Sequence, residues 1–234
     1  MAFSRVLDPP SRPEPDVLTS DMVGIGMGFA SPSGLEPNIE DTLFFASLAA
    51  MEEDDLRVLA ILTTWFGVHH AWVNADRLIR IVGSCESARV RALWAALSSW
   101  QRSDHRFARM HALHKGPRID VLATGTEFQL RRHGEDPRFE GTPIRAPANV
   151  LRDRPADVLD PADLARRHRA YRYRVMIGPS YRADAWAALE AKPDLSATAL
   201  ARAAYASFAT AWNVKREYAI VTAARHRPRS LQTW

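Results

Sequence analysis

Four successive segments in the first half of the chain share one pattern, in which a capping residue precedes apolar side chains at helical spacing. Asn38, Asp54 with Asp55, Asn74 and Ser87 stand where a side chain accepts hydrogen bonds from the first free amides of a helix. The apolar residues that follow recur every three to four positions, which is the spacing of one helix face. This half is therefore predicted to form a bundle of roughly four helices.

Composition places the chain among globular proteins, since 47% of its 234 residues are hydrophobic and 25% are charged. Apolar runs such as 58–68 are about half as long as a membrane-spanning helix requires, so no membrane segment is expected. Prolines crowd the first 15 residues, where a secretory signal would be apolar, and a cytoplasmic location is expected. Cys85 is the only cysteine, which excludes an internal disulfide.

The two halves of the chain carry net charges of opposite sign. Residues 1–110 contain ten arginines and fourteen acidic residues, whereas residues 111–234 contain 21 lysines or arginines and thirteen acidic residues. This asymmetry favours an interaction between the basic half and a polyanion, although two domains could also complement each other electrostatically. Arginine outnumbers lysine 28 to 3, which fits a GC-rich coding bias at least as well as a phosphate site.

The chain is predicted to have four parts. Residues 1–38, rich in proline and glycine, are expected to be extended. Residues 39–114 form the helical domain, with a role in dimerisation or partner binding. Residues 115–160 are expected to be a proline-rich connector with two short strands around Gly125. Residues 161–234 form a basic domain that begins with a helix.

The helical domain is rich in large aromatic side chains. They are Trp65, Phe66, Trp72, Trp94 and Trp100. This is more aromatic surface than four short helices are expected to bury alone, so part of it is predicted to form a homodimer or partner interface.

Residues 181–218 read as three helical pieces joined by short turns. Pro193 and Asp194 end the first piece, Ser196 caps the second, and Ser207 caps the third. In the third piece Ala211, Val214 and Tyr218 are expected to face inward. Its outward face then consists of Ala209, Thr210, Asn213, Arg216 and Glu217. Trp212 is expected to pack in the core.

This segment resembles the helix-turn-helix of bacterial transcription regulators. The matching residues are Leu200, Ala201, Ser207, Thr210 and Ala211. Tyr205 stands in the turn, where these regulators usually have glycine. The resemblance implies a mainly α fold with a small β element, in which an N-terminal helical bundle precedes a C-terminal, winged helix-turn-helix that binds double-stranded DNA.

Residues of the third helix have suitable chemistry for reading bases. Asparagine bonds adenine through two hydrogen bonds and arginine does the same with guanine, so Asn213 and Arg216 are predicted to contact base edges. Ser207, Ala209 and Thr210 lie at the start of this helix. They are predicted to lie close to the DNA, where the backbone amides of the first helical turn can contact a phosphate.

A run of five arginines without an acidic residue lies at 166–174. Arg169, Arg172 and Arg174 are predicted to contact phosphates on either side of the groove. The alternative is a strand whose tyrosines face the core while the arginines only cover the surface.

No pattern indicates an enzyme, a metal site or a cofactor. His111 and His114 have a spacing found in metal sites, but no carboxylate or cysteine joins them at a ligand-like interval. No Gly-x-Ser-x-Gly elbow is present, and Cys85 has no activating partner nearby in the sequence.

The sequence therefore predicts a sequence-specific DNA-binding regulator, expected to be a homodimer. Its layout resembles transcriptional antitoxins of the abortive-infection class, which accompany nucleotidyltransferase toxins, and this resemblance implies a toxin protein as a second partner. In that family the helix-turn-helix is usually N-terminal. The alternative is a non-enzymatic interaction or scaffold protein whose helix-turn-helix-like unit only packs, and a nucleic-acid enzyme ranks third.

Overall fold

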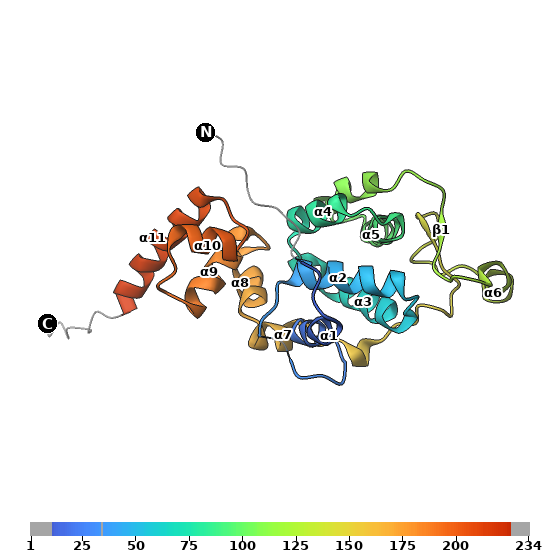
Figure 1. The fold of residues 1–234 in the computed structure, drawn as a ribbon, viewed down its shortest axis with the longest axis horizontal. Coiled ribbons are helices and arrows are strands. Elements are labelled where there is room, and N and C mark those ends of the chain that lie inside the picture. The colour runs from blue at the N-terminus through green and yellow to red at the C-terminus, as the bar shows by residue number, and fades with distance from the viewer. Residues whose placement is uncertain (1–10, 34, 226–234) are drawn as a thin grey trace, which may run out of the picture. The chain divides into compact units, whose positions relative to one another are not determined.

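The computed structural model describes residues 11–33 and 35–225, which divide into two compact units (Figure 1). The described residues up to His168 form the N-terminal unit, and those from Arg169 onward form the C-terminal unit. The predicted boundary at 161 lies one short helix too early. That helix, α7 (Pro161–Arg167), belongs to the N-terminal unit, where Leu164 is buried and His168 Nε2 lies 2.9 Å from Pro37 O.

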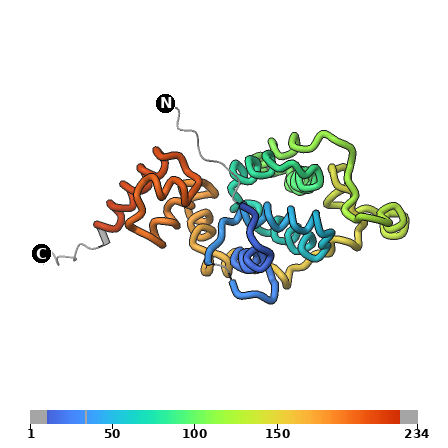
Figure 2. The backbone as a smooth tube through the Cα atoms, viewed as in Figure 1, coloured from blue at the N-terminus to red at the C-terminus, as the bar shows by residue number. Residues whose placement is uncertain are grey.

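Five longer helices form the body of the N-terminal unit (Figures 1 and 2). They are α1 (Pro15–Gly24), α2 (Ile39–Glu52), α3 (Leu56–His69), α4 (Ala75–Ser84) and α5 (Ala88–Trp100). Asn38, Asp55, Asn74 and Ser87 each accept a hydrogen bond from an amide of the following first turn. The four predicted helices and these capping residues are confirmed.

Helix α1 lies inside the segment that is predicted to be extended, so that prediction is wrong for residues 15–24. Pro15 occupies the first turn of the helix, where its missing amide hydrogen has no partner to lose. Leu18 and Met22, one turn apart, are buried and hold the helix against α2. Dense prolines thus precede and start a helix here instead of preventing one.

Three of the aromatic side chains singled out in the sequence lie in the interior of this unit. Trp65, Phe66 and Trp94 are fully buried, and the Phe66 ring centroid lies 5.5 Å from that of Trp94. The Trp65 indole donates to Ile25 O at 2.7 Å, and the Trp94 indole donates to Ser47 Oγ at 2.9 Å. These three aromatics are hidden within one chain and lend no support to the predicted homodimer interface. Trp72 and Trp100, the other two residues of that prediction, are half-buried.

The described part of the N-terminal unit also contains three short 3₁₀ helices. They are η1 (His70–Trp72), η2 (His105–Leu113) and η3 (Pro155–Asp157). Segment η2 packs against α4 and α5 and buries Phe107 and Met110. It covers aromatic surface that four helices alone would leave open.

The small β element is a parallel pair, formed by β1 (Ile119–Asp120) and β2 (Ile144–Arg145). The first strand agrees with the prediction, but the second strand predicted after Gly125 is wrong. That segment is helix α6 (Thr126–His133), which connects the two strands. A parallel pair requires such a crossover, whereas a strand directly after Gly125 would have formed a hairpin.

Arginines order the connector between β1 and α7. Arg118 donates to the carbonyl oxygens of Thr142 and Ile144, each at 2.7 Å. The Arg138 guanidinium lies 5.9 Å from the Trp100 ring centroid. Part of the arginine excess in the basic half therefore has a structural role.

The C-terminal unit consists of α8 (Arg169–Ile177), α9 (Tyr181–Ala191), α10 (Ala197–Ala203) and α11 (Phe208–Arg225) (Figure 1). Helix α9 packs against the other three helices. Small and aliphatic side chains form the core, namely Ala185, Leu189, Leu200, Ala204, Ala206, Ala211 and Val214. Residues 169–225 contain no strand, so the structure provides no wing within the described part of this unit.

Across the described ranges of both units, no helix combines the length and apolar character needed to cross a membrane.

Candidate nucleic-acid interface

The turn between α10 and α11 comprises residues 204–207. Tyr205 has a φ of +51°, in the left-handed region that glycine adopts without steric cost and other residues rarely occupy. The amide of the next residue, Ala206, donates to Ala201 O at 2.9 Å and closes the turn. The backbone therefore has the conformation that a glycine would favour, although tyrosine stands there.

This strain leads to a prediction about Tyr205. Val and Asn both remove the phenol ring, but a β-branched residue fits the left-handed region far less well than asparagine. Tyr205→Val is expected to lower the free energy of unfolding by about 1 kcal/mol more than Tyr205→Asn. Hydrogen exchange of the α10 and α11 amides measures the difference, and equal losses would contradict the proposed strain.

Ser207 is the N-cap of α11. Its Oγ accepts a hydrogen bond from the Thr210 amide at 3.1 Å and lies 2.8 Å from Thr210 Oγ1. The predicted cap is confirmed, and the two hydroxyls are engaged with each other at the start of the helix. The structure gives both residues a local role that is independent of any bound DNA.

The orientation of α11 agrees with the prediction for its inward face. Ala211 and Val214 are fully buried, and Tyr218 packs against the core cluster. Asn213 and Arg216 are exposed on the opposite side. Their side chains are therefore available to a ligand that approaches α11.

Trp212 is not in the core as predicted, because 46% of its surface is exposed. One helical step of about 100° separates it from buried Ala211, so both cannot point into the same narrow core. The Arg216 guanidinium carbon lies 4.7 Å from the Trp212 ring centroid. The two side chains, four residues apart, form a cation–π pair on the exposed face of α11.

The prediction that Arg174 contacts phosphate is wrong. Only 1% of its side chain is exposed, and its guanidinium binds the Asp184 carboxylate through two hydrogen bonds of 2.7 and 3.0 Å. Because Arg174 lies on α8 and Asp184 on α9, this pair joins the two helices. Arg174 faces the inside of the unit. Its place in a run of five arginines gives no indication of this burial.

Arg172 lies on the exposed side of α8 and binds Glu190 at 2.7 Å. Burial and a hydrogen bond to Glu190 raise the pKa of the Tyr173 phenol to about 12. Burial acts to raise the pKa of the Glu190 carboxyl. Hydrogen bonds from Tyr173 and Arg172 outweigh burial and hold this pKa below its usual value. Arg169 is half-buried. Phosphate contacts by Arg169 and Arg172 stay predictions, whereas the alternative of a strand is wrong because this segment is α8.

A third carboxylate near the candidate interface is Glu217 on α11. It forms an ion pair of 2.6 Å with Arg182 of α9. The ion pair with Arg182 offsets the negative charge of Glu217, which directly follows Arg216 in the chain. The pair also links α11 to α9 beside Arg216.

Sequence reasoning overlooked two exposed residues of this unit. Phe208 at the start of α11 is 50% exposed, and Arg202 on α10 is exposed. Helical periodicity could have identified Phe208 and Trp212 as exposed. They are four residues apart and share one face of α11, which differs from the face of buried Ala211 and Val214. Arg202 is the single cation of α10, the helix that precedes the turn.

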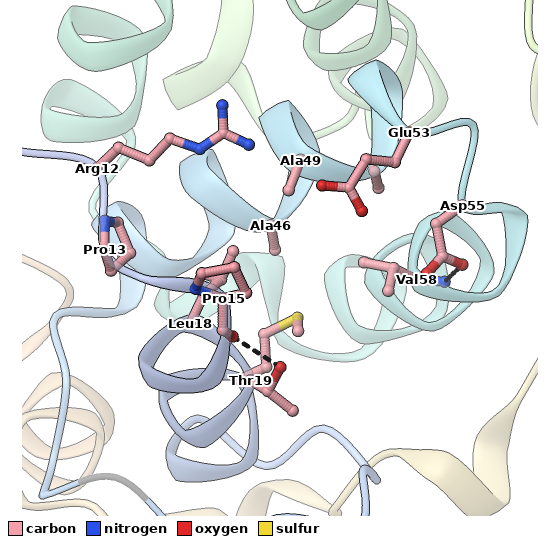
Figure 3. Close-up of a pocket in the computed structure, with 12 residues that line it drawn as sticks. Arg12, Pro13, Pro15, Leu18, Thr19, Ala46, Ala49, Glu53, Asp55 and Val58 are labelled. Atoms are coloured by element: carbon pink, nitrogen blue, oxygen red, sulfur yellow. Dashed lines mark hydrogen bonds between the residues drawn. The ribbon is translucent and has the colours of Figure 1, made fainter.

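The N-terminal unit contains a pocket of about 130 Å³ between α1, α2 and the start of α3 (Figure 3). Leu18 and Ala46 form part of its apolar wall, and Arg12 and Glu53 are charged residues of its lining (Figure 3). Thr19 supplies the only hydroxyl among the lining side chains, and it donates to a backbone oxygen of its own helix at 2.9 Å. The pocket offers space for a small molecule but no nucleophile and base in contact.

Among the described residues, no group of three or more histidine, cysteine or acidic side chains could hold a metal ion. Comparison of the chain with family models, with curated proteins and with solved structures gives no match.

Proposed function

We propose that the protein is a sequence-specific DNA-binding transcription regulator that reads bases with α11. The observation that carries the proposal is the three-helix arrangement of α9, α10 and α11. In it a left-handed turn at Tyr205 precedes a helix that is capped by Ser207 and exposes Asn213 and Arg216. A helix-turn-helix likewise presents a capped second helix to the major groove after a short turn, and this similarity supports the proposal.

The chemistry of the exposed face supports base reading. Asn213 can donate to and accept from one adenine edge, and Arg216 can donate twice to one guanine edge. Ala209 has only a methyl group, which allows the helix to approach the groove closely. Arg202 on α10 and, with its charge partly offset, Arg172 on α8 would supply phosphate contacts.

The test compares residues proposed to contact bases with an arginine proposed to contact phosphate in the same unit. Asn213→Ala and Arg216→Ala are each expected to weaken binding to the cognate duplex by about 1–3 kcal/mol and to leave non-specific binding nearly unchanged. Arg202→Ala is the control, since it should weaken binding to all duplexes alike and lower the salt slope by about one. Gel shifts over a salt series, with sites selected from a random duplex pool, measure both effects.

Two outcomes would contradict the proposal. Equal losses on cognate and scrambled duplexes for Asn213→Ala and Arg216→Ala would remove both residues from base reading. Absence of any salt-dependent duplex binding by the unchanged protein would reject the DNA-binding function as a whole.

One observation favours a second candidate function, protein interaction. Seven of the eleven exposed large apolar side chains in the described residues lie in the C-terminal unit. They are Val175, Met176, Ile177, Phe208, Trp212, Ile220 and Val221. Three of them, Val175, Met176 and Ile177, are consecutive at the end of α8, and a contiguous exposed apolar patch is typical of a surface that contacts another protein.

The same residues support two finer proposals, a homodimer and a toxin protein as partner. Met176→Ser, which removes the most exposed apolar side chain of α8, should weaken either association without changing the affinity for DNA half-sites. Light scattering measures the dimer, and co-expression with the product of an adjacent gene measures neutralisation of a toxin. A monomer at every concentration, with no co-purifying protein, would contradict both proposals.

A further inference from the structure

We propose that Trp212 is a positioning residue that holds the Arg216 guanidinium ready to recognise a guanine. The inference rests on the proposed DNA-binding function and assigns a base to one position of the DNA site. It starts from the contact between the two side chains, with the guanidinium carbon 4.7 Å from the ring centroid. Both residues lie on the exposed face of α11, one turn apart.

The guanidinium of Arg216 lies over the Trp212 ring, and the proposal takes it to stack flat on that ring, which leaves its recognition groups available. A guanidinium stacks through its flat face, while its five N–H groups point outward in the plane of the group. Guanine accepts hydrogen bonds at O6 and N7 from two of these in-plane donors. In this flat arrangement Trp212 would occupy the face of the Arg216 guanidinium and leave its edge for the base.

Stacking also reduces the cost of ordering the side chain. A solvent-exposed arginine samples many rotamers, and binding must select one of them. The Trp212 ring restricts this sampling before DNA arrives, so less freedom is lost when the complex forms. We expect this preorganisation to favour guanine specifically, because only guanine uses both oriented donors.

The nearest acidic group does not compete for Arg216. Glu217 follows it in the chain, but its carboxylate is paired with Arg182 at 2.6 Å. Among the described residues no carboxylate forms an ion pair with Arg216. The ring of Trp212 is thus the contact that sets the direction of this guanidinium.

Phe208 provides a matched control on the same helix. It lies one turn before Trp212 and is 50% exposed, compared with 46% for Trp212. No arginine lies over its ring in the described residues. Truncation of Phe208 therefore removes a similar apolar surface without removing a stacked arginine.

The experiment uses the full chain and duplexes selected from a random pool. The guanine whose replacement by adenine no longer matters in Arg216→Ala defines the Arg216 position of the site. Trp212→Ala is expected to lower the preference for guanine over adenine there by about two- to fivefold, from the strength of an exposed cation–π contact. Trp212→Phe should retain most of the preference, and Phe208→Ala should leave it unchanged.

An unchanged guanine preference in Trp212→Ala, or an equal loss in Phe208→Ala, would overturn the inference while leaving the DNA-binding function in place. Failure of the unchanged protein to prefer any duplex would reject both. A third measurement uses the free protein, in which the Trp212 ring current should shift the Arg216 Nε–H resonance. If Trp212→Leu leaves that resonance in place, the stacking does not exist in solution and the inference fails.

Discussion

Replacement of Arg174 by alanine is expected to lower the free energy of unfolding of the C-terminal unit by about 3–5 kcal/mol. The Asp184 carboxylate, only 8% exposed, would remain inside the unit without the guanidinium that binds it through two hydrogen bonds. A buried charge that loses its partner costs far more than the pair itself contributes. Because α8 and α9 are joined by this pair, hydrogen exchange of their amides should report the loss directly.

Arg172 is the matched control for this prediction, since it lies on the same helix and also forms an ion pair. Its side chain and that of Glu190 are 37% and 38% exposed, so water screens the pair. Arg172→Ala should therefore change stability by less than about 1 kcal/mol. Arg174→Met combined with Asp184→Leu should recover much of the loss, because both members of the buried pair are then apolar. Similar losses for Arg172→Ala and Arg174→Ala would contradict the buried pair.

Acid is expected to destabilise the N-terminal unit through His69. This side chain is fully buried, its Nε2 lies 3.0 Å from Leu159 O, and its ring lies 4.6 Å from that of Trp65. Burial lowers the pKa of His69 from 6.5 to about 4, although the hydrogen bond to Leu159 and the charge of Asp160 oppose the change. The folded unit therefore holds this imidazole in its neutral form.

The sign of the pH effect follows from the lowered pKa. Below about pH 6.5 the unfolded chain binds a proton at His69 that the folded unit rejects, so acid favours unfolding. Stability should fall by about 1.4 kcal/mol per pH unit down to about pH 4, which amounts to roughly 3 kcal/mol in all. Above pH 6.5 the residue is neutral in both states and contributes no pH dependence.

A variant separates His69 from the carboxylates that titrate in the same range. His69→Gln keeps a donor for Leu159 O but has no proton to gain. The difference in unfolding free energy between the unchanged protein and this variant should shift against the unchanged protein as the pH falls from 6.5 to 4. Urea denaturation at several pH values measures it, and a constant difference would show that His69 does not carry the effect.

Local features of the fold were predictable from the sequence alone. The caps at Asn38, Asn74, Ser87 and Ser207 act on amides two or three residues away, so residue type and spacing suffice to identify them. Apolar periodicity placed the four helices of the bundle and the inward face of α11 for the same reason. The same periodicity places Asn213 and Arg216 on the exposed face of α11, and their side-chain chemistry then suggests adenine and guanine as the bases they would contact.

Burial and pairing, in contrast, were decided by tertiary structure. Arg172 and Arg174 stand in one arginine-rich run and look alike in sequence. Only the packing of α9 brings Asp184 to Arg174 inside the unit and leaves Arg172 at the surface with Glu190. Desolvation depends on neighbours from other helices, and short-range spacing carries no record of them.

The same reason explains the other corrections. Trp65 and Trp94 are buried because α1 and η2 cover side chains that the predicted four-helix bundle would leave open. Trp212 is exposed because small alanine side chains already fill the core beneath α11. The segment after Gly125 became a helix because β1 pairs with a strand farther along the chain. Sequence determined where helices start and which residue types they carry, and long-range packing determined which of those residues a ligand can reach.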